Sequence, residues 1–207
     1  MKKFLFILIL LIASCSPSED TKKSDKNSDN TIEVSGEIKR IVVGNQDAKI
    51  LIIAFESLTC THCANFHKDV YPQLKKDYID KGLVQIEFRH FPLDITALNA
   101  SKISQCKNDG DPKILESLYS NQHKWIKGST IEEANTNLQK FLSNEGINVN
   151  FESCINNKQI EDFILNDRIN GAKNFKVNAT PTIIINNEKF EKPLNFKNLK
   201  KAIEKLI

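Results

Sequence analysis

Hydrophobic residues recur with two different spacings along the chain, and these spacings distinguish strands from helices. The continuous apolar run at 49–55 (KILIIAF) is typical of a strand buried on both faces. Alternating apolar positions at 83–91 (LVQIEFRHF) predict a second strand, which Pro92 ends. Between them, apolar residues at helical spacing predict a helix over 60–80, kinked or broken at Pro72. The pattern therefore predicts a β-α-β unit.

The later part of the chain is mainly helical. Helical patterns follow at about 96–107, 112–126, 130–144 and 151–174. Short strands at 182–185 and 188–191 and a helix at 196–207 come last, and a short strand at 38–43 comes first. Because strands occur at both ends and only helices in the middle, the pattern predicts one α/β domain with an all-α insertion at about 95–174.

The first 37 residues differ from the rest in composition. A basic start is followed by nine apolar residues (4–12) and by small residues up to Cys15, the arrangement of a secretory signal peptide over 1–14. The apolar run is about half of the ~20 residues that a membrane-spanning helix needs; an uncleaved anchor helix is the alternative. Residues 15–37 predict a flexible tether, because they bury too little apolar surface to offset their ordering entropy. The folded domain is then 38–207.

Composition and charge narrow the function. Hydrophobic residues make up 40% of the 207, which is enough for a core and argues against a wholly disordered chain. The net charge is +3, and loss of 1–14 removes two lysines and leaves 27 basic and 26 acidic residues. A nearly neutral mature chain gives no reason to expect nucleic-acid binding.

The chain has five cysteines, an odd number for an exported protein. Cys60 and Cys63 form a C-x-x-C motif directly after the buried strand, at the start of the predicted helix. Two intervening residues make one helical turn, which brings the sulfurs within bridging distance. Cys60 lies at the helix N-terminus, where unpaired N–H groups and the dipole stabilise a thiolate, and Cys63 lies one turn further in. In a β-α-β setting this motif predicts a redox centre.

Thr61 and His62 lie between the two cysteines and are expected to tune them. His62 adds a positive or hydrogen-bonding group beside the Cys60 thiolate. A stabilised thiolate is a good leaving group, so the disulfide becomes reactive and oxidising. The alternative is that His62 is a solvated helix residue.

Three segments resemble a known family. Residues 56–67 (ESLTCTHCANFH) are similar to the active-site segment of the DsbA family, thioredoxin-fold thiol–disulfide oxidoreductases of the bacterial periplasm. Residues 89–94 (RHFPLD) resemble the strand end before that family's helical insertion, and 177–184 (VNATPTII) resemble its cis-proline segment. The similarity spans about 38–207 and implies an α/β, thioredoxin-like fold with an inserted all-α subdomain.

The resemblance also implies that Pro181 is cis and that its loop faces the C-x-x-C pair. Proline offers no N–H, which leaves the backbone at Thr180 free to pair with an extended substrate. An ordinary strand-initiating proline is the alternative.

One position departs from the family pattern. Family members often carry a buried acid six residues before the first cysteine, as a candidate proton acceptor for the second cysteine, and here that residue is Ala54. Glu56 would lie on the same strand face but displaced by about 6–7 Å. The sequence leaves open whether Glu56 takes over this role.

The other paired cysteines, Cys106 and Cys154, fall in the predicted insertion. In an oxidising compartment they are expected to form a structural disulfide, worth roughly 4 kcal/mol from chain entropy. Two buried free thiols are the alternative.

Residues 12–15 (IASC) resemble the lipobox of bacterial lipoproteins, which implies that Cys15 is lipidated and begins the mature chain. Two or more acyl chains would hold it stably, since each buried CH₂ contributes about 0.8 kcal/mol. The expected location is the periplasm, tethered to a membrane through Cys15, or else soluble in the periplasm after signal cleavage.

Together these features predict a monomeric dithiol oxidase that introduces disulfides into exported polypeptides with free thiols. It would need no organic cofactor or metal, and the resemblance implies a DsbB-like membrane quinone reductase as its reoxidant. A disulfide isomerase or reductase using the same centre is the first alternative, and a non-enzymatic, metal-binding lipoprotein is the second. Cys60, Cys63 and His67 could supply three zinc ligands, but no second nearby pair completes a structural set. His67 is otherwise expected on the helix surface or in packing.

Overall fold

The computed structural model describes residues 36–207. The expected signal peptide, Cys15 and nearly all of the expected tether lie outside the described residues. Within 36–207, no helix combines the length and apolar character that crossing a membrane requires.

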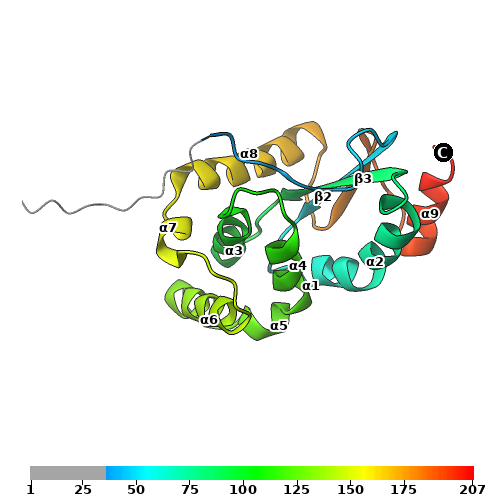
Figure 1. The fold of residues 1–207 in the computed structure, drawn as a ribbon. Coiled ribbons are helices and arrows are strands. Elements are labelled where there is room, and N and C mark those ends of the chain that lie inside the picture. The colour runs from blue at the N-terminus through cyan, green and yellow to red at the C-terminus, as the bar shows by residue number, and fades with distance from the viewer. Residues whose placement is uncertain (1–35) are drawn as a thin grey trace, which may run out of the picture.

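A five-stranded mixed sheet forms the centre of the fold, in the order β1-β3-β2-β4-β5. The strands are β1 (Ile41–Val43), β2 (Ile50–Glu56), β3 (Val84–His90), β4 (Thr182–Ile185) and β5 (Glu188–Lys189). Only β2 and β3 pair in parallel, in a register that places Glu56 beside His90. A parallel pair needs a crossover connection, and the helical segment that begins at the C-x-x-C motif supplies it (Figure 1).

That crossover is one helical segment with changes of winding along it. It comprises α1 (Thr61–Asn65), the π-helical η1 (Phe66–Val70), α2 (Tyr71–Leu74) and the π-helical η2 (Lys75–Ile79). Pro72 lies in the first turn of α2, where a missing backbone N–H costs least. The predicted interruption near this proline is confirmed, and the π-helical turns on either side extend it.

The helices between β3 and β4 form an all-helical insertion. They are α3 (Ile95–Gln105), α4 (Lys113–Ser120), α5 (Gln122–Trp125), α6 (Ile131–Asn144), α7 (Phe151–Ile155) and α8 (Lys158–Asn174), and α9 (Phe196–Ile203) follows β5. Two expected helices, 112–126 and 151–174, are each divided into two. Asn157 caps α8 by accepting from the Ile160 N–H, because an asparagine side chain competes with the helix for backbone donors.

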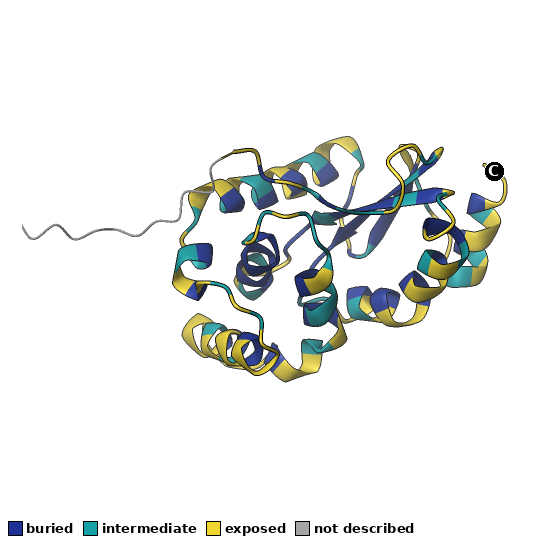
Figure 2. Cartoon of the chain, viewed as in Figure 1, coloured by how far each residue is buried: buried dark blue, intermediate teal, exposed yellow. Residues whose placement is uncertain are grey.

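Alternate residues of β2 face two separate apolar clusters. Ile52 and Ala54 belong to the large cluster that includes the α1–η2 segment and α9, whereas Ile53 and Phe55 pack on the opposite face. Gly171 of α8 lies against the Phe55 ring, since a Cβ there would come within 2.8 Å of it. In Figure 2 the buried stretches of the helices turn toward the sheet and toward one another.

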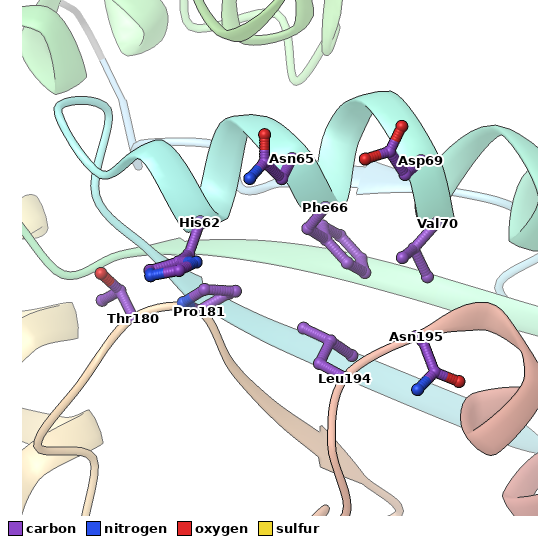
Figure 3. Close-up of a pocket in the computed structure, with 9 residues that line it drawn as sticks. All are labelled: His62, Asn65, Phe66, Asp69, Val70, Thr180, Pro181, Leu194 and Asn195. Atoms are coloured by element: carbon purple, nitrogen blue, oxygen red, sulfur yellow. The ribbon is translucent and has the colours of Figure 1, made fainter.

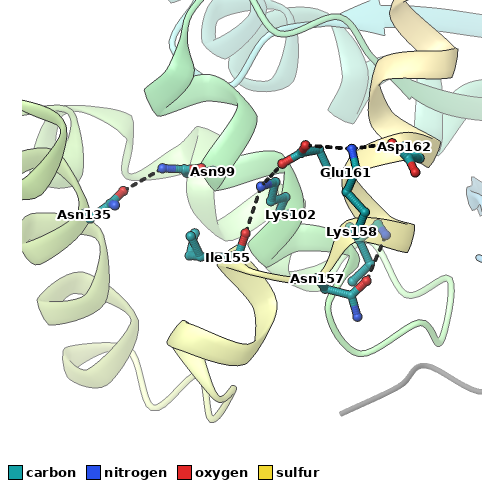
Figure 4. Close-up of polar contacts among 9 residues, drawn as sticks. Asn99, Lys102, Asn135, Ile155, Asn157, Lys158, Glu161 and Asp162 are labelled. Carbon is teal, nitrogen blue, oxygen red and sulfur yellow. Dashed lines mark hydrogen bonds and ion pairs between the residues drawn. The ribbon is translucent and has the colours of Figure 1, made fainter. Parts of the chain in front are cut away.

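Polar contacts and a disulfide fasten the insertion. Cys106, after α3, is bonded to Cys154 of α7, with their Cα atoms 5.4 Å apart. Beside this bridge, the buried Lys102 ammonium donates to the Ile155 carbonyl at 2.8 Å and pairs with Glu161 of α8. Figure 4 shows how these contacts link α3, α7 and α8. The disulfide therefore joins α3 to α7 covalently, and a partly buried ion pair joins α3 to α8.

Candidate active site

The C-x-x-C pair lies at the carboxyl end of β2, where the chain turns into α1. Cys60 is the residue before the helix, and its carbonyl accepts from the backbone N–H groups of Cys63 and Ala64, both at 3.1 Å. The Cys60 thiol is partly exposed, whereas the Cys63 thiol is completely buried. One sulfur is thus accessible to a partner and the other is shielded by the fold.

The two thiols have opposite acidities. A hydrogen bond from the Cys63 thiol, supported by Thr180 and by the backbone N–H groups of Cys63 and His62, lowers the pKa of Cys60 to about 5. Burial opposes this shift without overcoming it. Burial itself raises the pKa of Cys63, and the negative charge of Glu56 adds to that effect. At neutral pH the accessible sulfur is therefore a thiolate and the buried sulfur a thiol.

The cis-proline loop faces this pair. The Thr180–Pro181 peptide is cis, and the Thr180 carbonyl lies 3.3 Å from the Cys60 sulfur, which is 120 residues away in the sequence. The Thr182 hydroxyl donates to the Ala179 carbonyl at 2.7 Å and so holds the turn that enters β4. Backbone of the loop is thereby placed directly beside the accessible sulfur.

An open groove of about 480 Å³ runs from the motif along the first helical segment. Its lining residues are His62, Asn65, Phe66, Asp69, Val70, Thr180, Pro181, Leu194 and Asn195. In Figure 3, Phe66 and Val70 point from the helix toward Leu194, with His62 and Pro181 together at one end. The floor is apolar and the rim polar. His62 is exposed here, and Thr61 is exposed at the first position of α1.

Two residues that sequence reasoning missed hold the turn before the motif. The Gln122 amide donates to the carbonyls of Leu58 and Cys60, at 2.8 and 3.0 Å. The Thr59 hydroxyl donates to the Asp94 carboxylate at 2.7 Å. Asp94 ends the RHFPLD segment, which was a signal for its importance. Gln122 gave none, because its partners lie more than sixty residues away.

Glu56 and His67 form a buried pair beside the motif. Glu56 Oε2 and His67 Nε2 are 2.8 Å apart, and both side chains are at most 4% exposed. His67 is therefore a packing residue rather than a helix-surface one. It shares the face of Cys63, Val70 and Leu74, a spacing that could have identified it. No group of three metal-ligating side chains is present in the described part of the chain.

Comparisons with known proteins agree with this geometry. The thioredoxin family model matches residues 37–205. The crystal structure of Wolbachia pipientis alpha-DsbA1 superposes with a TM-score of 0.72 and 31% identity, over 81% of this chain and 90% of that one. The chain therefore belongs to the thioredoxin family, among the DsbA-like thiol:disulfide oxidoreductases. This confirms the expected thioredoxin-like fold with a helical insertion.

Further relatives place the chain among proteins of disulfide exchange. Disulfide bond formation protein D of Bacillus subtilis is 26% identical over 176 residues, which cover 79% of this chain and 75% of that protein. Crystalline BdbD from the same organism has the same fold, with a TM-score of 0.66 at 24% identity. The rickettsial relatives are longer: the chain spans 76% of the Rickettsia bellii protein and 61% of that of Rickettsia prowazekii.

Proposed function

We propose that this protein is a dithiol oxidase that introduces disulfides into exported polypeptides through Cys60 and Cys63. The observation that carries the proposal is the asymmetry of the two sulfurs, an accessible thiolate beside a buried thiol. A thiolate that is stable in the reduced protein makes that state favourable, so the disulfide state readily gives up its bond to a substrate.

The proposed reaction has two exchanges. A substrate thiolate attacks the Cys60 sulfur of the Cys60–Cys63 disulfide, which forms a mixed disulfide and releases Cys63. A second thiolate of the substrate then attacks the substrate sulfur of that bond, so the substrate gains a disulfide and Cys60 leaves as the stabilised thiolate. Two electrons pass to the protein. Backbone at Thr180, beside the Cys60 sulfur, would pair with the extended substrate.

An oxidase also needs a reoxidant, substrates and a cellular location. Turnover needs a reoxidant, and a DsbB-like membrane quinone reductase fits the chemistry. Substrates would be exported polypeptides with free thiols, and the protein would act as a monomer in the periplasm, held at a membrane through a lipidated Cys15 or free after signal cleavage. The Bacillus subtilis relative is named for disulfide bond formation, which supports the oxidative direction.

The redox potential decides between an oxidase and an isomerase or reductase with the same centre. Equilibration of the full chain with a glutathione buffer should give a potential nearer to the strongly oxidising value of about −120 mV than to the reducing value of about −270 mV. The proportion of dithiol at each ratio can be measured by thiol alkylation and mass spectrometry. A value near the reducing end would contradict the oxidase and favour the alternative.

The groove beside the motif is expected to bind the substrate segment that flanks the reacting cysteine. Replacement of Leu194 by Asp places a charge against the apolar floor, and should lower kcat/KM for a cysteine-containing peptide by about tenfold. The redox potential should not move, because the thiol environment is unchanged. Leu206→Asp is the matched control, since Leu206 is exposed and lies outside this groove. Equal losses in both variants would argue against binding in the groove.

A further inference from the structure

Glu56 and His67 form a buried pair beside the C-x-x-C motif, and neither residue has a part in the two exchanges proposed above. Glu56 lies at the end of β2 on the face that Ile52 and Ala54 share, and His67 lies in η1. The Nε2–Oε2 contact of 2.8 Å requires a proton between the two atoms, whichever group carries it. The pair therefore stores at least one proton in a site closed to bulk water.

Both residues also keep a free polar end inside the protein. Glu56 Oε1 and His67 Nδ1 are buried and have no hydrogen-bond partner among the described residues. An unpartnered buried polar atom costs about 1–3 kcal/mol, and two in one pair need an explanation. Free lone pairs on these atoms are what a group that accepts and returns a proton requires.

The position of the pair points to Cys63 as its partner. His67 follows Cys63 by four residues, which places it one turn further along the same helix face. The charge of Glu56 raises the pKa of Cys63, and the charge of Cys60 raises that of Glu56, so the carboxyl group interacts with both sulfurs. Burial makes Cys63 hard to ionise, yet only its thiolate can attack Cys60.

The packing around His67 holds its ring in a fixed position. The Tyr119 ring stacks on it with a centroid distance of 4.1 Å, and Phe88 and Tyr71 pack at 5.2 and 5.4 Å. The π-helical winding of η1 begins at Phe66, directly before this residue, and such turns are frequent at functional sites.

The other titratable groups around the pair do not compete for its proton. Burial raises the pKa of Tyr119 and Tyr71, so both stay neutral, and the Tyr71 hydroxyl donates to Glu116 at 3.0 Å. His90, beside Glu56 across β2 and β3, contacts Gln105, and burial lowers its pKa to about 3. Glu56 and His67 are thus the groups available to Cys63.

We propose that Glu56 and His67 act together as the proton acceptor and donor for Cys63 during disulfide exchange. The inference rests on the proposed function of the two cysteines. When a mixed disulfide on Cys60 is resolved, the Cys63 thiol passes its proton to the pair and its sulfur attacks the Cys60 sulfur. The Cys60–Cys63 bond forms, and the partner leaves as a thiolate. In the opposite exchange Cys63 leaves as a thiolate and takes the proton back.

Reaction with dithiobis(nitrobenzoate) has two phases, which separate this role from that of Cys60. The full chain carries Cys15→Ser and is reduced at Cys60 and Cys63, with the Cys106–Cys154 disulfide intact. The Cys60 thiolate attacks the reagent and releases one coloured thiolate, and the attack of Cys63 on the resulting mixed disulfide releases a second. In Glu56→Gln the first phase should keep its rate and the second should slow by about 10²-fold at neutral pH, the usual worth of a positioned base. His67→Gln should slow the same phase. The double variant should be no slower than the slower single variant, because the two residues act as a unit.

The pH profile distinguishes a lost proton acceptor from a disturbed fold. In Glu56→Gln the second phase should rise by about tenfold per pH unit, because only the thiolate attacks and its fraction grows in that proportion. The wild-type profile should be flatter. His90, in β3, is the other buried histidine of the described residues, so His90→Gln is the matched control and should leave both phases unchanged.

Each outcome has one meaning. An unchanged second phase in Glu56→Gln or His67→Gln, additive losses in the double variant, or equal slowing of both phases would overturn the inference while leaving the oxidase proposal intact. A slow first phase in the wild type would instead contradict the proposed function. Nitrogen NMR of the His67 ring in the wild type needs no variant: its shifts should differ between the dithiol and disulfide states, and identical shifts would count against the pair.

Discussion

Replacement of Cys60 by serine should reduce oxidation of a thiol-containing protein substrate to its background level, a loss of more than about 10⁴-fold. The Cys60 sulfur is the accessible one and carries the stabilised thiolate, whereas Cys63 is completely buried and unable to meet a substrate. Replacement of Cys63 by serine should have a different consequence. The reduced Cys60 thiolate can still attack a disulfide of an oxidised substrate, but the internal resolving sulfur is lost, so mixed disulfides with that substrate should accumulate.

Loss of oxidation in Cys60→Ser is measured with a reduced, unfolded protein as substrate, whereas the accumulation in Cys63→Ser is measured with a disulfide-containing protein, which supplies the oxidised sulfur. Mass spectrometry after acid quenching counts the substrate disulfides and detects mixed disulfides. The paired replacement of Cys106 and Cys154 by serine is the control, because it removes the other disulfide and leaves the C-x-x-C motif intact. Continued substrate oxidation by Cys60→Ser would contradict the proposed role of Cys60.

The stability difference between the reduced and oxidised protein should depend strongly on pH. The pKa of Cys60 is about 5 in the folded, reduced protein, against about 8.5 for an unfolded cysteine. Because the folded pKa is the lower one, the thiolate contributes its full stability above the unfolded pKa, and that contribution is lost as pH falls to 5. Reduced protein should therefore gain stability over oxidised protein as pH rises from 5 to 8, with no further change below 5.

Thermal or denaturant unfolding of both redox states across this pH range tests the linkage. Groups that titrate in both redox states, such as Glu56, contribute nearly equally to the stability of each and largely cancel in the difference. The raised pKa of Cys63 affects stability only above pH 8. Reduced Cys60→Ser should lose the pH-dependent gain. The ultraviolet absorbance of the wild-type thiolate should titrate with a midpoint near 5, and a midpoint near 8.5 would contradict both the linkage and the oxidising character.

Much of the fold follows from local patterns along the sequence. The apolar run of β2 and the alternation of β3 mark both parallel strands, since side-chain spacing reports burial directly. Helical spacing alone does not show where a polar residue ends one helix and begins the next. Asn157, for example, divides an expected helix at 151–174 because its side chain caps the second half. Such a choice depends on neighbours in space as well as in sequence.

The candidate site shows the same division. The C-x-x-C spacing determines by itself that two sulfurs meet at a helix N-terminus, because one helical turn joins them. Contacts between distant segments were decided only by the tertiary structure: Thr180 beside Cys60, Gln122 on the motif carbonyls, and Cys106 on Cys154. No local pattern encodes which of many possible partners a segment will meet.

The acid near the motif is the clearest example. The sequence established that Ala54 stands where relatives often carry an acid, and that Glu56 lies two residues further on the same strand face. It left open whether that shift of about 6–7 Å removes the carboxylate from the sulfurs. The tertiary structure brings His67 from the crossover helix to the end of β2, where it pairs with Glu56 at 2.8 Å, and the Glu56 charge there raises the pKa of Cys63. Spacing along one strand fixes the direction of a side chain, but only packing between elements fixes its neighbours.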